Sequence, residues 1–314
     1  IYDRLVGSEM CIRDRGTHIR NLLEGIREGE KVVSILPLDR ELIQNPKGHY
    51  IIFATSQGRI KRSHLSDYVK INRNGKYALK FAKDSDSLVQ VRPATEEDHV
   101  VLVSSMGYAC RFLPSEAKTR VDAATGESVT THTVRVQGRV SQGVAGMKLQ
   151  SGDRVVGMIV TDDFDTSVLT ISKHGMAKRS RLGSGSMVEI KLEDGTIAQG
   201  DDGGPLMERD GYRKTNRGTK GVRTMALSDG DSIIGVRQIP DLSDQLFMLT
   251  DKGMMIRMPA TQTKETLGKV TKGTRIMELR TKDKESYADE IVFVARLPSD
   301  LVERGDVESD GEEE

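Results

Sequence analysis

The feature that most constrains the fold is a hairpin motif that occurs four times along the chain. Each copy is an apolar run ending in Ser or Thr, then a two-residue step whose second residue is Gly, then a short run ending in Arg. The copies cover residues 50–62, 100–111, 167–179 and 245–257. A two-residue hairpin loop requires positive φ, which Gly adopts without a Cβ clash. The motif therefore predicts four antiparallel hairpins.

A second landmark recurs between the hairpins: a Gly, a large apolar residue six positions later, and then a β-rich run. The pairs are Gly16/Leu22, Gly75/Phe81, Gly143/Leu149, Gly221/Leu227 and Gly273/Leu279. The runs that follow them cover residues 31–36, 87–91, 154–159, 232–236 and 290–294. A hairpin with two further strands has the size of a propeller blade. The prediction is an all-β, propeller-like fold with about four complete four-stranded blades and the end of a preceding one.

The spacing of the landmarks predicts the domain organisation. The hairpin glycines lie 49, 68 and 78 residues apart, so we expect surface insertions near residues 118–140 and 183–210. The end of a preceding blade would occupy residues 16–38, and four blades would occupy residues 39–298. Residues 1–15 lack any landmark, and their end, SEMCIRDR, resembles a translated sequencing adapter. We expect that segment to be non-native and the natural chain to extend further upstream; a native unstructured terminus is the alternative.

The sequence offers no pattern typical of a catalytic or metal site. Its six His residues are scattered and its two Cys are far apart, and neither a phosphate-binding Gly-rich loop nor a nucleophile elbow is present. We therefore expect no active site, metal or cofactor in this chain. No apolar stretch is long enough to cross a membrane, which favours a cytoplasmic protein.

The net charge of zero conceals two regions of opposite sign. Residues 303–314 hold seven acids and one base, so the rest of the chain carries +6. We expect residues 299–314 to form an acidic disordered tail that competes with a polyanion for basic surface; a tail that only aids solubility is the alternative.

Basic residues gather beside the repeat landmarks. In a ring of blades, equivalent positions fall on one circumference, so repeated cations would form a positive belt suited to the phosphates of duplex DNA. An aromatic content of 4% without Trp argues against the stacking of single strands. The predicted DNA-binding residues are Arg59, Lys61, Arg62, Arg73, Lys76, Arg139, Lys178, Arg179, Arg181, Arg213, Lys214, Arg217, Lys220, Arg223, Lys269, Lys272 and Arg275.

One group of arginines has two interpretations at this point. Arg62, Arg111, Arg179 and Arg257 end the four hairpins and share a strand face with apolar residues. They would either contact phosphate or join neighbouring blades, and the sequence leaves both open.

The hairpin runs FATSQGRIKR, LVSSMGYACR, LTISKHGMAKR and MLTDKGMMIR, together with GYRKTNRGTKGV at residues 211–222, resemble a known family. It is the C-terminal β-pinwheel domain of the DNA gyrase A subunit, with the corresponding domain of topoisomerase IV as a close relative, and the resemblance covers residues 16–298. It implies that this domain wraps duplex DNA chirally so that an A2B2 holoenzyme, completed by the gyrase B subunit, introduces negative supercoils. ATP and Mg²⁺ would act elsewhere in that holoenzyme, which would be cytoplasmic, bacterial and nucleoid-associated.

Two further interpretations stand beside gyrase, and a third, a propeller enzyme, is disfavoured. The resemblance implies that the basic double-glycine heptapeptide typical of gyrase belongs to a first blade, which we expect to lie upstream of this chain. Residues 217–221 are similar to the core of that heptapeptide but have Thr219 where its second Gly is usual. Topoisomerase IV is therefore an alternative. A propeller-like protein-interaction scaffold is another, which would require exposed aromatic residues. A propeller enzyme would need acids or histidines at equivalent repeat positions, where this chain has Gly, Ser, Thr and aliphatic residues.

Overall fold

The computed structural model describes residues 30, 32–70, 75–121, 126, 128–192, 195–200, 203–266, 271–281 and 286–300. Within them the fold is all-β, as predicted, with short helical turns α3 (Arg40–Gln44), α4 (Ser66–Val69) and η2 (Ala260–Gln262). The predicted segments 1–15, most of 16–38 and residues 301–314 of the tail lie outside the described residues.

Four antiparallel sheets contain the four predicted hairpins. The first sheet has the order β3 (Leu88–Ala94), β1 (Tyr50–Thr55), β2 (Arg59–His64), β8 (Val144–Ala145). The second has the order β9 (Val155–Thr161), β4 (His99–Ser104), β5 (Tyr108–Phe112), β14 (Val222–Arg223). The third has the order β15 (Ile233–Ile239), β10 (Ser167–Ser172), β11 (Met176–Arg181), β18 (Thr274–Arg275), and the fourth β19 (Ile291–Leu297), β16 (Gln245–Thr250), β17 (Met255–Pro259).

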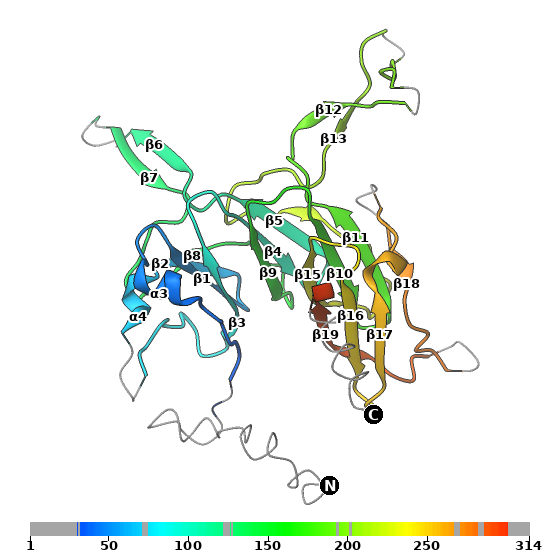
Figure 1. Ribbon diagram of the computed structural model, residues 1–314, viewed down its shortest axis with the longest axis horizontal. Coiled ribbons are helices and arrows are strands. Elements are labelled where there is room, and N and C mark those ends of the chain that lie inside the picture. The colour runs from blue at the N-terminus through cyan, green and yellow to red at the C-terminus, as the bar shows by residue number, and fades with distance from the viewer. Residues whose placement is uncertain are drawn as a thin grey trace, which may run out of the picture.

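The outermost strand of each four-stranded sheet comes from beyond the next hairpin of the chain. Strand β8 follows the hairpin β4–β5 yet completes the sheet of β1–β2, and β14 and β18 are displaced in the same way. The inner strands β3, β9, β15 and β19 gather around the middle of the molecule (Figure 1), and the outermost strands lie at the opposite edge of each sheet. Neighbouring sheets are thereby tied to one another by backbone hydrogen bonds.

The four predicted blades correspond to four sheets, of which the last has three strands among the described residues. The described residues form three four-stranded sheets and one three-stranded sheet, because no described segment pairs with the outer side of β17. The β-rich run predicted at residues 31–36 forms no strand in its described part, since no described strand pairs with it. The other four runs correspond to β3, β9, β15 and β19.

The hydrophobic core lies between the sheets, one cluster at each junction. Val100 and Leu102 of β4 pack towards the first sheet, whereas Val101 and Val103 pack towards the third. A third cluster joins the third and fourth sheets. Strands buried on both faces need apolar residues at successive positions, which explains why the hairpin runs do not alternate.

An aspartate two residues before each inner strand fixes the neighbouring hairpin turn. Asp153 accepts hydrogen bonds from the Met106 backbone N–H (3.0 Å) and the Ser105 hydroxyl (2.8 Å). Asp86, Asp231 and Asp289 accept a turn N–H in the same way, at 2.9, 3.2 and 3.2 Å. A charge-assisted bond of this kind satisfies a turn amide.

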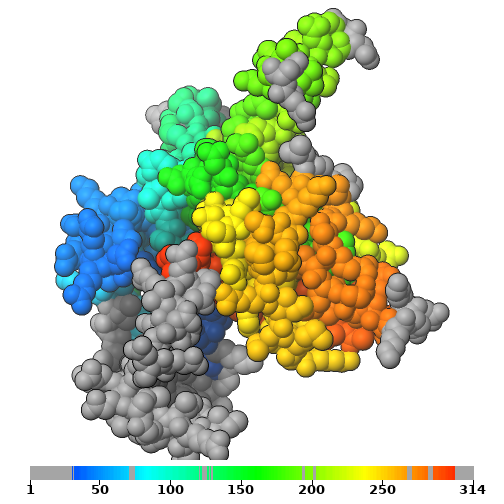
Figure 2. All heavy atoms as spheres, turned by 45° about the vertical axis from the view of Figure 1, so that its right-hand side comes forward, coloured from blue at the N-terminus to red at the C-terminus, as the bar shows by residue number. Residues whose placement is uncertain are grey.

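Two predicted insertions each contain an antiparallel hairpin that projects from the ring. One is β6 (Ala117–Val121) with β7 (Ser128–His132), and the other is β12 (Met187–Glu189) with β13 (Met207–Arg209). The β12–β13 arm stands clear of the body in both views (Figures 1 and 2). Its apolar side chains Met187, Leu192, Leu206 and Met207 are exposed.

The glycine of the second landmark permits the close approach of each outermost strand. A Cβ on Gly221 would lie 2.1 Å from the Ala109 carbonyl oxygen, and Gly143 and Gly273 have equivalent contacts at 2.4 and 2.2 Å. All three have positive φ. These glycines therefore allow the strand exchange between sheets.

We expect Gly221→Ala to lower the free energy of unfolding by about 2–4 kcal/mol, because the methyl group would collide with backbone and the φ of +80° is strained for Ala. Gly230→Ala is the matched control, since Gly230 has φ +73° but no atom within 4 Å, and should cost about 1 kcal/mol. Urea unfolding of both variants measures the difference. Equal losses would contradict a role for close approach.

Candidate nucleic-acid interface

Four of the predicted DNA-binding cations are buried, and the prediction is corrected for them. Lys61, Arg62, Lys178 and Arg179 are at most 8% exposed. The Lys61 ammonium donates to the carbonyls of Ala78 and Arg139, both at 2.6 Å. The Lys178 ammonium donates to the Thr224 carbonyl at 2.7 Å. Desolvation lowers the pKa of both lysines to about 8. Side chains held in this way are unavailable to phosphate.

The arginines that end the hairpins join neighbouring segments, which resolves the choice left open by the sequence for three of the four. Arg111 donates to the carbonyls of Leu182 (3.1 Å), Gly183 (2.7 Å) and Tyr212 (2.8 Å). Arg179 pairs with Glu265 at 2.6 Å. Arg62 pairs with Glu96 at 2.7 Å and stacks over Tyr50.

The fourth hairpin differs from the other three. Arg257 is exposed and its guanidinium donates to Gln245 on the adjacent strand of its own hairpin. It therefore joins no neighbouring sheet among the described residues, in keeping with the absence of a described strand beside β17.

The outermost strand pairs carry one arginine in each four-stranded sheet. Arg59 is paired in register with Ala145, Arg223 with Tyr108, and Arg275 with Met176. The lysines that precede Gly221 and Gly273 lie beside these arginines in the chain. We call this set the outer rim: Arg59, Lys220, Arg223, Lys272 and Arg275. All are exposed except Arg59, which is half-buried and donates to the carbonyls of Gln142 and Gly143.

Tyr108 organises the most compact group of rim cations. The Lys220 ammonium lies 4.2 Å from the centre of its ring, and the Arg223 guanidinium lies 5.2 Å from it. Arg223 also donates to the Tyr108 hydroxyl at 3.0 Å. Hydrogen bonding by Lys220, then by Arg223, lowers the pKa of this tyrosine. The ring orients two cations towards one patch of solvent, where an anion can contact both.

The segment that leads into β14 carries further cations. Arg213 and Lys214 are exposed, and Lys214 forms an ion pair with Glu116 at 2.6 Å. Arg217 donates to the carbonyls of Thr133 and Ala145, which leaves it mainly a structural role.

The other predicted residues are dispersed. Arg139 is exposed, Lys76 donates to the Asp67 carbonyl at 3.4 Å, and Arg181 pairs with Asp165 at 2.9 Å. Arg73 and Lys269 lie outside the described residues. The structure thus groups some of the predicted DNA-binding cations in the outer rim and places the others elsewhere.

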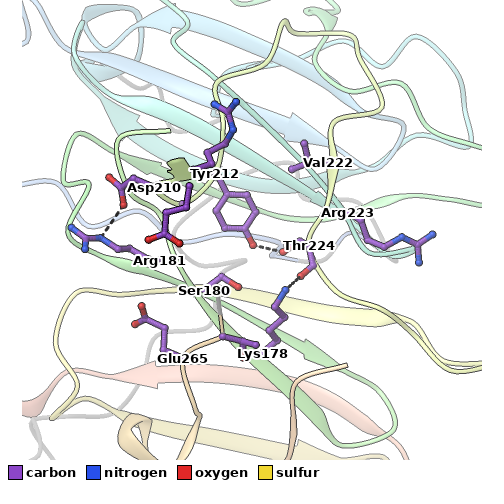
Figure 3. A pocket seen from close by; sticks show the side chains of 13 residues that line it. Lys178, Ser180, Arg181, Asp210, Tyr212, Val222, Arg223, Thr224 and Glu265 are labelled. Carbon is purple, nitrogen blue, oxygen red and sulfur yellow. Dashed lines mark hydrogen bonds and ion pairs between the residues drawn. The ribbon is translucent and has the colours of Figure 1, made fainter. Parts of the chain in front are cut away.

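A cavity of about 140 Å³ lies behind the outer rim, between β11 and β14. Lys178, Tyr212 and Thr224 point towards one another inside it, whereas Arg223 points away from them (Figure 3). Acids and bases both line the cavity, and Arg181 there pairs with Asp210 at 3.5 Å. No described part of the chain gathers three metal-ligating side chains. Nor is any described helix long and apolar enough to span a membrane.

The geometry defines a class: a propeller-like ring of sheets in which each outermost strand pair carries one arginine. A family model described as the DNA gyrase C-terminal domain, β-propeller, matches residues 49–95, 128–162, 166–184, 207–240 and 244–297, more than half of the chain. The chain belongs to this family of gyrase-type C-terminal β-pinwheel domains.

Individual relatives agree with the family match. The chain is similar to the DNA gyrase A subunit of Staphylococcus epidermidis, with 28% identity over 86% of this chain, and to that of Rickettsia prowazekii, with 30% identity over 86%. It spans only 25% and 30% of the length of those two proteins.

Solved structures show the same fold. A structure of the C-terminal domain of DNA topoisomerase IV superimposes with a TM-score of 0.65 at 19% identity, covering 94% of this chain and 76% of that one. A structure of the DNA gyrase A C-terminal domain gives a TM-score of 0.55 at 20% identity, covering 80% and 66%. At such identities the likeness concerns the fold alone.

The buried lysine predicts a pH dependence of stability. The pKa of Lys178 falls from its ordinary 10.5 in the unfolded chain to about 8 in the fold. Between these values the unfolded state binds more protons, so stability rises with pH. Lys178→Met should show a smaller rise between pH 8 and 10.5, because only the contribution of Lys61 remains, whereas Lys220→Met, at an exposed site, should keep the full rise. Unfolding curves at several pH values measure the slopes, and identical slopes in wild type and Lys178→Met would refute the assignment.

Proposed function

We propose that this chain is the DNA-wrapping C-terminal domain of the A subunit of a type II topoisomerase, with DNA gyrase as the enzyme. The observation that carries the proposal is the repetition of the outer rim, which has one arginine in each of three equivalent strand pairs. Contacts from such positions to phosphate groups do not depend on the base sequence of the DNA.

The spatial arrangement of the outer rim suits a bent duplex. Bending a few tens of base pairs costs several kcal/mol, which only many distributed contacts offset. Each neutralised phosphate also releases counterions and adds roughly −0.9 to the log–log salt slope of binding. Sheets arranged around a common middle present those contacts along a curve, so the DNA that follows them is bent.

The holoenzyme is part of this proposal. Its catalytic core would lie in a portion of the A subunit that this chain does not contain, and the B subunit would join it in an A2B2 assembly. ATP and Mg²⁺ would be used there, so that the present chain needs no cofactor of its own. The setting would be the bacterial cytoplasm, at the nucleoid. Topoisomerase IV is the alternative enzyme, since its C-terminal domain and that of gyrase A share this fold.

The proposal predicts the effect of removing rim charge. Lys220→Gln with Arg223→Gln should weaken duplex binding about tenfold and reduce the magnitude of the salt slope by roughly 2, one unit per lost phosphate contact. Gel-shift titrations of linear duplexes at several salt concentrations measure both quantities.

A matched control separates the rim from net charge. Lys83→Gln with Lys252→Gln removes the same charge from exposed positions away from the outermost strands, and its affinity and slope should stay close to those of the wild type. Equal losses in the two double variants, or an unchanged slope in the rim variant, would count against a rim-bound duplex.

A further inference from the structure

The inner strands enclose a cavity that the proposed function does not use. Strands β3, β9, β15 and β19, with Val33 and Ser34, line a space of about 840 Å³ at the middle of the ring. Pockets of a few hundred to about 1,000 Å³ commonly hold small ligands. The outer rim lies at the opposite edge of each sheet, so the two surfaces are separate.

Three arginines from three different sheets line this cavity. They are Arg92 on β3, Arg237 on β15 and Arg296 on β19, and no Asp or Glu is among the described lining residues. Arg237 donates to the carbonyls of Val236 (2.8 Å) and Val294. Arg296 pairs with Asp244 at 3.1 Å. The guanidinium of Arg92 makes no hydrogen bond or ion pair with any described residue.

The charge of Arg92 lies close enough to those of Arg237 and Arg296 to be repelled by both. Arg92 is exposed, but partial desolvation lowers its pKa, and the next cause is the charge of Arg296. Burial likewise lowers the pKa of Arg237, and the next cause there is the charge of Arg92. Arginine nevertheless stays protonated in proteins. The cavity therefore holds three cations and, among the described residues, only the Arg296 charge has an acidic partner.

We propose that the central cavity binds a small, multiply charged phosphate compound, such as tripolyphosphate or the phosphate chain of a nucleotide. Guanidinium groups match phosphate oxygens with paired N–H donors, and an anion placed among the three would be attracted to each. Arg92 would supply the donors least engaged by protein, while the carbonyl bonds of Arg237 and the ion pair of Arg296 hold those two side chains in place.

The acidic segment at residues 303–314 is the rival occupant, because it begins five residues after Pro298, which lines the cavity. A segment tethered so closely would compete with a free anion. The free anion and the acidic segment are both negatively charged, so the experiment must distinguish which of them binds in the cavity.

The test is isothermal titration of the full 314-residue chain with tripolyphosphate and, separately, with ATP, at moderate salt. We expect saturable binding of one anion per chain, and Arg92→Gln should weaken it about tenfold, the loss of one charged contact. The affinity of Arg92→Lys for the anion should fall between those of the wild type and Arg92→Gln. Lys220→Gln, on the outer rim, should bind as the wild type does.

Thermal unfolding checks that the variant is folded. Because Arg92→Gln relieves repulsion and breaks no described hydrogen bond, its Tm should be no lower than that of the wild type. Absence of saturable binding to the full chain would overturn the proposal. So would an equal loss in Lys220→Gln, which would place the anion on the outer rim. Binding that appears only after removal of residues 301–314 would assign the cavity to the acidic segment instead.

Discussion

The structure depends on the exchange of outermost strands between neighbouring sheets. Each exchanged strand contributes two residues, and it fits only because Gly143, Gly221 or Gly273 precedes it and lets two backbones approach. The hydrogen bonds formed there fix which sheet stands beside which. They also bring Arg223 beside Tyr108 and Arg275 beside Met176, so the same constraint that closes the sheets creates the outer rim.

Much of this architecture could be predicted from the sequence, because hairpin turns and close backbone contacts both require glycine at defined positions. The partner of each outermost strand could not. Val144 pairs with Ile60, more than eighty residues earlier, and nothing in a local pattern encodes such a pairing. The aspartates that cap the turns were a readable signal, since Asp86, Asp153, Asp231 and Asp289 all stand two residues before an inner strand, and sequence reasoning missed them.

The site was harder to predict than the fold for a physical reason. Period-two alternation places Lys61 and Lys178 on a strand, but both faces of these strands are covered by neighbouring sheets, so a cation there is buried and must find carbonyl partners. A charged residue in a strand can therefore be assigned to the protein surface only where one face of that strand is exposed to solvent. The outermost strands β14 and β18 meet that condition, and Arg223 and Arg275 are exposed on them.

The central claim is that the ring bends duplex DNA around its outer rim rather than merely binding it. The most direct test is ligation of singly nicked plasmid in the presence of increasing amounts of the protein, followed by measurement of the linking number after the protein is removed. Chiral wrapping predicts a shift of one sign that grows with the ratio of protein to DNA. A plasmid that is fully bound, as judged by gel shift, yet sealed at the linking number of free DNA would contradict the account.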